Sequence, residues 1–210
     1  MRYKGLQRTA LGLAAVMAVQ SVFAPAVYAN ARSNFDLRKK VIGLTGITFV
    51  GGNIDRKVTR AEFAKMLVQA SSYRSVLTKS SNVSVFNDVS QGNEYASAIR
   101  IAAEQNYMSG FLGGKFKPDD YVTLHEGVKG VLTLLGYAST EFAGDSYNKR
   151  MAKYAFLELN EGITKTAEEG LTVRDCINLF YNLLKTNMAT GGSSYVASVF
   201  DGELTSDKEV

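Results

Sequence analysis

The chain has 210 residues, with 24 lysines and arginines, 20 aspartates and glutamates, one histidine and one cysteine. Positions 1–29 hold three of the basic residues and none of the acidic ones, so the rest carries 21 basic and 20 acidic residues. A net charge of about +1 for that remainder argues against a nucleic-acid-binding protein. A lone cysteine excludes an internal disulfide, so packing must hold the fold together.

Residues 1–29 have the pattern of a secretory signal peptide. Arg2, Lys4 and Arg8 form a charged lead, residues 10–19 are almost wholly apolar, and small residues stand near position 29. No later segment approaches the roughly 20 apolar residues that a membrane helix needs. We therefore expect an exported chain without a membrane span once the signal is removed. Export without disulfides suits a Gram-positive surface protein.

One helix-start signal occurs three times along the chain. In each copy an apolar residue, a threonine and an acid three positions after the threonine precede a run of helical periodicity. The threonine can accept a hydrogen bond from the first helical turn while the acid reaches back to the threonine N–H, which is a capping box. The expected capping pairs are Thr59 with Glu62, Thr123 with Glu126, and Thr172 with Asp175.

The signal belongs to a longer repeated unit. The three threonines lie 64 and 49 residues apart, and the apolar positions that follow them match in register. Glycine-rich loops precede the first two capped helices at 43–52 and 109–118, and amphipathic segments at 95–105 and 147–159 precede the second and third. Self-similarity of this kind predicts tandem helix-loop-helix repeats whose apolar faces bury one another.

These units resemble the surface-layer homology (SLH) domain family, whose unit opens on Phe-x-Asp-Val, turns through a glycine loop and restarts on Thr-Arg-Ala-Glu-Phe. The second unit matches throughout, with Phe86-Asn87-Asp88-Val89, the loop 110–118 and Val122-Thr123. The first unit keeps Thr-Arg-Ala-Glu-Phe at 59–63 behind an abbreviated front half, and the third lacks most of the loop.

The resemblance implies a mainly α fold in which three tandem repeats form a three-pronged pseudo-trimer around a central three-helix bundle. We expect a signal peptide at 1–29 and repeats at 30–80, 81–140 and 141–187. Residues 188–210 would form a linker and tail, because Thr190-Gly191-Gly192-Ser193-Ser194 has the composition of a flexible linker. Proteins of this kind usually carry cargo, so either a C-terminal cargo domain lies beyond this sequence or the repeats are themselves the product.

The resemblance also implies a function, the non-covalent anchoring of an exported protein to the bacterial cell wall or S-layer. Its partner would be a secondary cell-wall polysaccharide linked to peptidoglycan, often one with pyruvylated sugars. The binding arginine of the family maps onto Arg60, where a guanidinium could grip a carboxylate beside free N–H groups of the first helical turn. The equivalent positions in repeats 2 and 3 are Leu124 and Val173. We therefore expect Arg60→Ala to weaken binding and to leave the fold nearly untouched.

The glycine loop of repeat 2 supplies two further candidate ligand contacts, Gly114 through its backbone and Lys115 through its charge. Gly113 stands where the family has an aspartate, which weakens any expected polar contact from that position. Arg174 lies one position after the third helix start and would point about 100 degrees further round the helix. We do not extend the binding role to Arg174.

Other functions have less support. No pair of carboxylates suggests a glycosidase, and no nucleophile motif suggests an acyl-transfer enzyme, so we expect no catalytic residue and no cofactor. The sole histidine, His125, lacks partners for a metal site, and Cys176 falls on a packed helix face. The sequence before the second capped helix resembles a calcium loop only superficially, because the aspartate ladder is missing. A degenerate scaffold or self-association module that binds no glycan remains the main alternative.

Overall fold

The computed structural model describes residues 23–48, 50–205 and 209–210, and the regular elements of those segments are helices joined by turns and loops, with isolated backbone bridges. Residues 36–210 form one compact unit. The α-helices are α1 (Phe23–Thr45), α2 (Arg60–Ala70), α3 (Ala96–Glu104), α4 (Leu124–Leu134), α5 (Ser146–Phe156), α6 (Val173–Lys185) and α7 (Tyr195–Val199). Two short 3-10 helices are η1 (Ser72–Val76) and η2 (Ser139–Phe142). The mainly α class predicted from the repeats is confirmed.

The three predicted helix starts begin α2, α4 and α6. At each start the threonine side chain accepts the N–H of the acid, and the acid accepts the threonine N–H, so all three are reciprocal capping boxes. Such a box satisfies two backbone donors that the first turn otherwise leaves without partners. The local signal is therefore enough to place the first residue of each helix.

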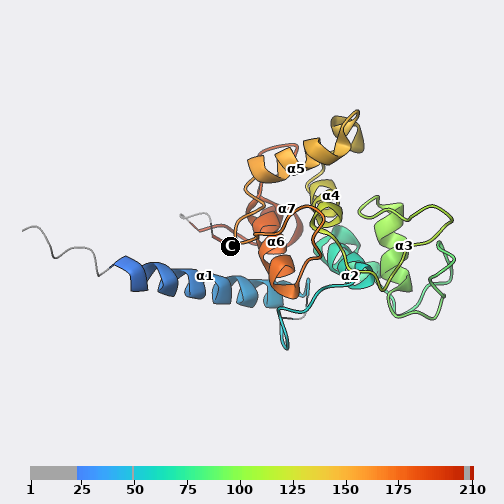
Figure 1. The fold of residues 1–210 in the computed structure, drawn as a ribbon, viewed down its shortest axis with the longest axis horizontal. Coiled ribbons are helices and arrows are strands. Elements are labelled where there is room, and N and C mark those ends of the chain that lie inside the picture. The colour runs from blue at the N-terminus through green and yellow to red at the C-terminus, as the bar shows by residue number, and fades with distance from the viewer. Residues whose placement is uncertain (1–22, 49, 206–208) are drawn as a thin grey trace, which may run out of the picture. The chain divides into compact units, whose positions relative to one another are not determined.

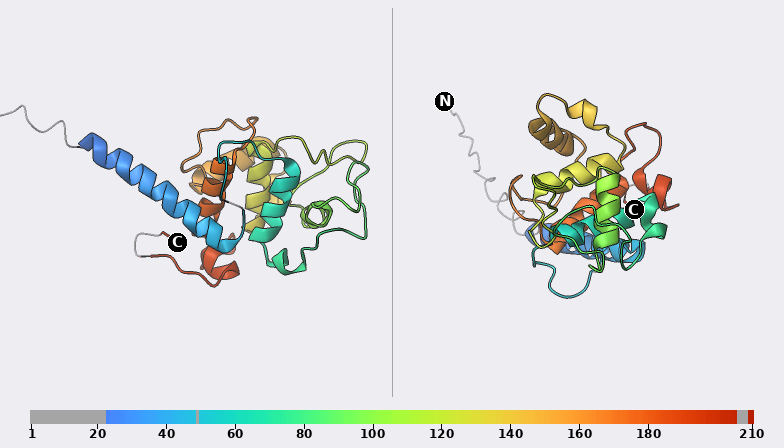
Figure 2. Two further views of the ribbon diagram at one scale, coloured as in Figure 1. Left: turned by 90° about the horizontal axis from the view of Figure 1, so that it is seen from below. Right: turned by 90° about the vertical axis from the view of Figure 1, so that its right-hand side faces the viewer.

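The helices α2, α4 and α6 pack against one another at the centre of the compact unit (Figures 1 and 2). The rings of Phe63 in α2 and Phe180 in α6 lie 5.6 Å apart between centroids. Glycines in α4 allow close approach, since a Cβ atom at Gly130 would lie 2.7 Å from the Leu67 side chain of α2. The positions matched by sequence are fully buried in all three helices: Ala64, Val128 and Ile177, and likewise Leu67, Val131 and Phe180.

A closed ring of backbone hydrogen bonds joins the three repeats just before their capped helices. Val58 donates its N–H to the Leu171 carbonyl over 2.9 Å, Leu171 donates to Val122 over 2.9 Å, and Val122 donates to Val58 over 3.1 Å. All three side chains are completely buried. The apolar residue that precedes each threonine therefore has a tertiary role that local capping does not require.

The N-terminal end of each capped helix is bonded to the segment before the next one. In α2 the N–H groups of Arg60 and Ala61 donate to the carbonyls of Asp120 and Pro118. The N–H groups of Leu124 and His125 in α4 donate to Glu169 and Ala167, and those of Val173 and Arg174 in α6 donate to Arg56 and Ile54. The chain thus returns from repeat 3 to repeat 1, and every repeat contacts both of the others.

Each repeat also has a helix before its loop. In repeats 2 and 3 these are α3 and α5, close to the predicted segments, and in repeat 1 the structure places α1 there, where the sequence suggested an abbreviated front half. After these three helices the backbone takes a positive φ, at Gly46 (71°), Asn106 (59°) and Glu158 (55°). Residues 1–22 of the predicted signal peptide lie outside the described residues, and 23–29 belong to α1.

The segment predicted as linker and tail is folded against the compact unit where it is described. Gly191 and Gly192 adopt positive φ angles in a tight turn, across which the Met188 N–H donates to the Ser193 carbonyl over 3.0 Å. After the turn, Tyr195 of α7 is 1% exposed, and its hydroxyl donates to the Ala70 carbonyl at the end of α2 over 2.8 Å. Linker-like composition here marks a turn that brings a fourth apolar element onto the bundle.

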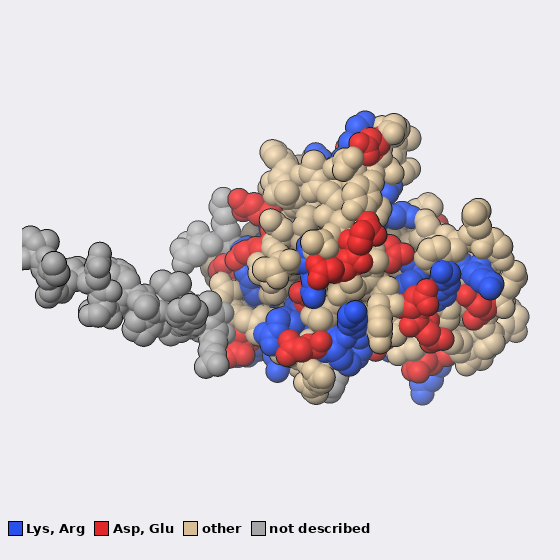
Figure 3. All heavy atoms as spheres, viewed as in Figure 1, with Lys and Arg blue, Asp and Glu red and all other residues tan. Residues whose placement is uncertain are grey.

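The described residues contain no helix that is both long enough and apolar enough to cross a lipid bilayer. On the face shown in Figure 3, basic and acidic side chains are interspersed. That mixture agrees with the near-balanced composition of the chain beyond position 29.

Candidate functional site

Arg60 lies at the contact between α2 and the glycine loop of repeat 2. Its side chain is 2% exposed. Nε donates to the Phe116 carbonyl over 2.9 Å, Nη2 donates to the Ser109 carbonyl over 2.8 Å, and Nη1 forms a salt bridge with Glu126. The guanidinium also lies 4.6 Å from the ring centroids of Phe111 and Phe116. Arg60 therefore joins repeat 1 to both the loop and the capped helix of repeat 2.

This environment changes what was expected of Arg60. Because Arg60 has three acceptors and almost no exposure, we now expect Arg60→Ala to destabilise the fold, contrary to the prediction from the sequence. The expected free N–H groups are absent as well, because the N–H groups of Arg60 and Ala61 already donate to loop carbonyls. Burial lowers the pKa of Arg60, and the carboxylate of Glu126 offsets this in part.

The equivalent positions in the other repeats share the burial of Arg60 but not its chemistry. Leu124 is 1% exposed and Val173 is 3% exposed. An apolar residue therefore fits this buried position without a desolvation penalty. A buried arginine there loses hydration free energy, which only hydrogen bonds to nearby acceptors can offset. Repeat 1 differs because the loop that it faces presents two inward carbonyls and α4 presents the carboxylate of Glu126.

The capping acids have different second partners. Glu126 completes the α4 capping box and also pairs with Arg60, although its own side chain is 27% exposed. Glu62 completes the α2 box and receives two hydrogen bonds from Arg56, at 2.8 and 3.0 Å. The nearest arginine to Glu62 in sequence, Arg60, is not its partner. Capping and inter-repeat pairing are thus combined in Glu126.

Gly114 and Lys115 lie at the turn of the loop that Arg60 holds. Gly114 has a φ of 69°, and its carbonyl accepts the Asn87 N–H over 2.8 Å. A Cβ atom at Gly114 would come within 3.0 Å of the Asn87 amide. Lys115 is exposed, and its carbonyl accepts the Phe111 N–H over 2.7 Å. The loop therefore presents the Lys115 side chain to solvent on a closed backbone turn.

Two residues of the Phe-Asn-Asp-Val motif shape this loop, a role that we did not predict for them. The two carboxylate oxygens of Asp88 accept the N–H groups of Phe116 and Lys117, each over 2.8 Å. The side-chain amide of Asn87 donates to the Gly113 carbonyl over 3.1 Å. The signal was present in the sequence as an Asn-Asp pair ahead of a glycine loop, a typical source of side-chain-to-backbone bonds.

Lys129 of α4 is a further cation at this site that the sequence did not single out. Its ammonium group contacts the Ser109 hydroxyl, next to the carbonyl that Arg60 binds. Burial lowers the pKa of Lys129, and the positive charges of Arg150 and Arg60 lower it further. The carboxylate of Glu126 acts in the opposite direction and raises the pKa of Lys129.

The remaining residues considered in the sequence, His125, Cys176 and Arg174, pack or pair with other parts of the fold. The rings of His125 and Tyr147 lie 4.4 Å apart between centroids, and no group of metal-binding side chains occurs among the described residues. Cys176 is fully buried, and burial raises the pKa of its thiol well above the usual value. Arg174 donates to Asp55 from Nε over 2.8 Å, so it links repeat 3 to repeat 1.

Comparison with known proteins adds a family and two relatives. Residues 85–126 match the S-layer homology domain family. Over 159 residues, which is 73% of this chain, the sequence is 26% identical to a middle cell wall protein of Brevibacillus brevis. Over 109 residues, 52% of this chain, it is 28% identical to a surface layer protein of Brevibacillus choshinensis.

The matched segments cover only 15% and 10% of those two relatives. The S-layer homology match spans the Asn87–Asp88 pair, the glycine loop and the α4 capping box, which are the parts of repeat 2 that surround Arg60. Together, the domain and the relatives indicate a protein of the bacterial cell surface. The resemblance seen in the sequence is confirmed by this match to the S-layer homology domain family over residues 85–126.

Proposed function

We propose that this chain anchors an exported protein to the bacterial cell wall by binding a secondary cell-wall polysaccharide without covalent linkage. The observation that carries the proposal is the meeting of two predicted site elements from different repeats. Arg60 of repeat 1 bonds the loop of repeat 2 that carries Gly114 and Lys115. We further propose that the three repeats, joined by their ring of hydrogen bonds, form the three-pronged pseudo-trimer.

The ligand group that fits best is a carboxylate, such as that of a pyruvylated sugar. Two acceptors of Arg60 are backbone carbonyls of a closed loop, whereas the third, Glu126, is a partly exposed side chain. A ligand carboxylate could take the place of Glu126 at Nη1 with no change to the loop, and Lys115 would add charge from the rim. A hydrogen bond between a charged donor and a carboxylate is about twice as strong as one between neutral groups.

The test is sedimentation of the purified protein with cell walls. We expect the protein to sediment with intact walls and to stay in solution after the secondary polymer has been extracted. Lys115→Gln should weaken sedimentation, and Lys40→Gln is the matched control, because both lysines are exposed and Lys40 lies in α1 away from the loop. Equal sedimentation before and after extraction would refute glycan binding.

A second function is favoured by the burial of Arg60. A guanidinium with three internal acceptors is what a self-associating scaffold without a glycan site would retain for stability alone. In that case wall extraction should have no effect, and sedimentation velocity should show assemblies that grow with protein concentration. We propose no catalytic role and no cofactor for either function, and any cargo would lie in sequence beyond this chain.

A further inference from the structure

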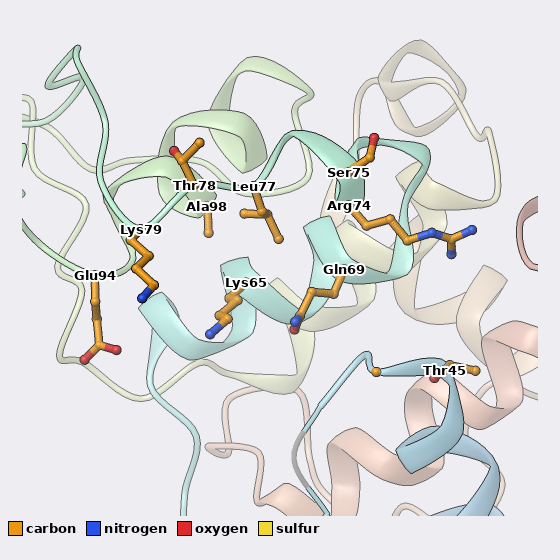
Figure 4. Close-up of a pocket in the computed structure, with 11 residues that line it drawn as sticks. Thr45, Lys65, Gln69, Arg74, Ser75, Leu77, Thr78, Lys79, Glu94 and Ala98 are labelled. Carbon is orange, nitrogen blue, oxygen red and sulfur yellow. The ribbon is translucent and has the colours of Figure 1, made fainter.

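A separate pocket of about 580 Å³ opens along the outer face of α2. It lies between α2, the end of α1, the segment from η1 to residue 79, and α3 (Figure 4). Its volume falls within the range typical of small-molecule sites. No residue that lines it belongs to the Arg60 site or to the glycine loop.

Three cations and one acid line this pocket, and the cations lack acidic partners. Among the described residues, no carboxylate forms a salt bridge with Lys65, Arg74 or Lys79. Figure 4 shows Lys65 and Lys79 close together on one side of the pocket, with Glu94 beside Lys79. Within the part of the chain that the structure describes, the pocket therefore carries more positive than negative charge, with three cations against one acid.

Hydrogen bonds to neighbouring segments fix the positions of Arg74 and Thr78 in the pocket wall. Arg74 donates from Nη2 to the Val199 carbonyl over 2.6 Å and lies 4.2 Å from the centroid of the Phe200 ring. Thr78 donates its N–H over 3.3 Å to the hydroxyl of Ser97, which is fully buried in α3. The wall formed by residues 74–79 is thereby attached both to the C-terminal segment and to α3.

The remaining lining suits a sugar ring. Leu77 and Ala98 supply apolar surface, while Gln69 and Thr78 supply both donors and acceptors. A saccharide presents an apolar ring face together with hydroxyl groups, so this mixture matches it better than it matches a purely apolar ligand. The acid at one end, Glu94, opposes a doubly charged group more strongly than a singly charged one.

We propose that this pocket is a second subsite, which binds a sugar unit bearing a single carboxylate between Lys65 and Lys79. The wall polysaccharide as the source of that unit rests on the proposed function, but occupancy of the pocket does not. A polymer that reached both this pocket and the Arg60 site would be held at two positions, which raises the effective affinity of each contact.

The experiment is a titration of the isotope-labelled protein followed by amide NMR shifts. The probe is methyl glucoside carrying a 4,6-pyruvyl ketal, its methyl ester is the uncharged control, and glycerol 3-phosphate is the phosphate control. We expect the acid to shift the amides of Gln69, Thr78 and Ala98 and to bind more weakly as salt rises. The double variant Lys65→Gln/Lys79→Gln should lose about tenfold or more in affinity.

The matched control is Lys40→Gln/Lys149→Gln, which removes the same charge from two exposed lysines outside the pocket. Unchanged pocket amides, equal affinity for acid and ester, preference for glycerol 3-phosphate, or equal loss in the control variant would each overturn the proposal. Shifts confined to residues 110–116 would support the Arg60 site and overturn this one. Pocket shifts in a protein that does not sediment with walls would support this subsite and refute wall anchoring.

Discussion

Replacing Arg60 by leucine is the sharpest test of how the repeats hold together. Leucine is the natural occupant of the equivalent buried position in repeat 2. The change removes the donors to the carbonyls of Phe116 and Ser109 and the partner of Glu126. Removing one member of a buried ion pair costs about 3 to 5 kcal/mol. Because Glu126 can regain water, we expect the lower end, a loss of about 3 kcal/mol in the free energy of unfolding.

Urea unfolding followed by circular dichroism at 222 nm measures this loss. With a slope of about 2 kcal/mol per molar urea, the midpoint should fall by about 1.5 M. Arg56→Leu is the matched control, because Arg56 also pairs with a capping acid, Glu62, but is 48% exposed. Exposed pairs contribute about 1 kcal/mol or less, so the control should shift the midpoint by no more than about 0.5 M.

A double-mutant cycle separates the ion pair from the loop contacts. Arg60→Leu, Glu126→Gln and the double variant should show a coupling energy above about 1 kcal/mol. If Arg60→Leu unfolds at the wild-type midpoint, or no more easily than Arg56→Leu, the inferred role of Arg60 in joining repeats 1 and 2 is refuted. Normal stability with lost wall binding would restore the expectation drawn from the sequence, in which Arg60 acts on the ligand alone.

Three further outcomes follow from the geometry. Thr59→Ala should lower the free energy of unfolding by about 1 kcal/mol in the same urea assay. The control Thr164→Ala, at an exposed position, should have almost no effect. Asp88→Ala should speed amide hydrogen exchange at residues 116 and 117, and unchanged exchange there would contradict its role in the loop. Burial, followed by the charge of Arg150, lowers the pKa of His125, so protonation favours the unfolded chain. The free energy of unfolding should therefore fall as the pH drops below about 6.5, and it should fall less steeply in His125→Asn. If the wild-type protein and His125→Asn lose stability in parallel, His125 is not the cause of the pH dependence.

Local chemistry was sufficient to predict the helical repeats. A threonine, an acid three residues later and a periodic apolar face act within a few residues of one another, so the starts of α2, α4 and α6 and their buried positions follow from the sequence. The same holds for the glycine loop of repeat 2, where several glycines mark a turn with positive φ. The S-layer homology match falls on this segment, where the motif is most complete.

Contacts between distant segments decided the rest. The ring of Val58, Val122 and Leu171 joins residues from three repeats. Each precedes a capping threonine, but that local pattern does not specify which distant carbonyl its N–H binds. A contact between distant segments also explains α7. The glycine-serine segment before it has the composition of a linker, and only the hydrogen bond from the Tyr195 hydroxyl to the end of α2 shows that α7 packs on the bundle. Distant contacts likewise explain why α1 was missed as the front helix of repeat 1.

Arg60 shows the division most clearly. Its place in the first turn of a capped helix is determined by the sequence, because the capping box specifies where α2 begins. Whether its guanidinium faces solvent or the interior depends on carbonyls 49 and 56 residues further along the chain, at Ser109 and Phe116. A charged side chain is stable in the interior only where acceptors surround it. Only the tertiary structure supplies those acceptors.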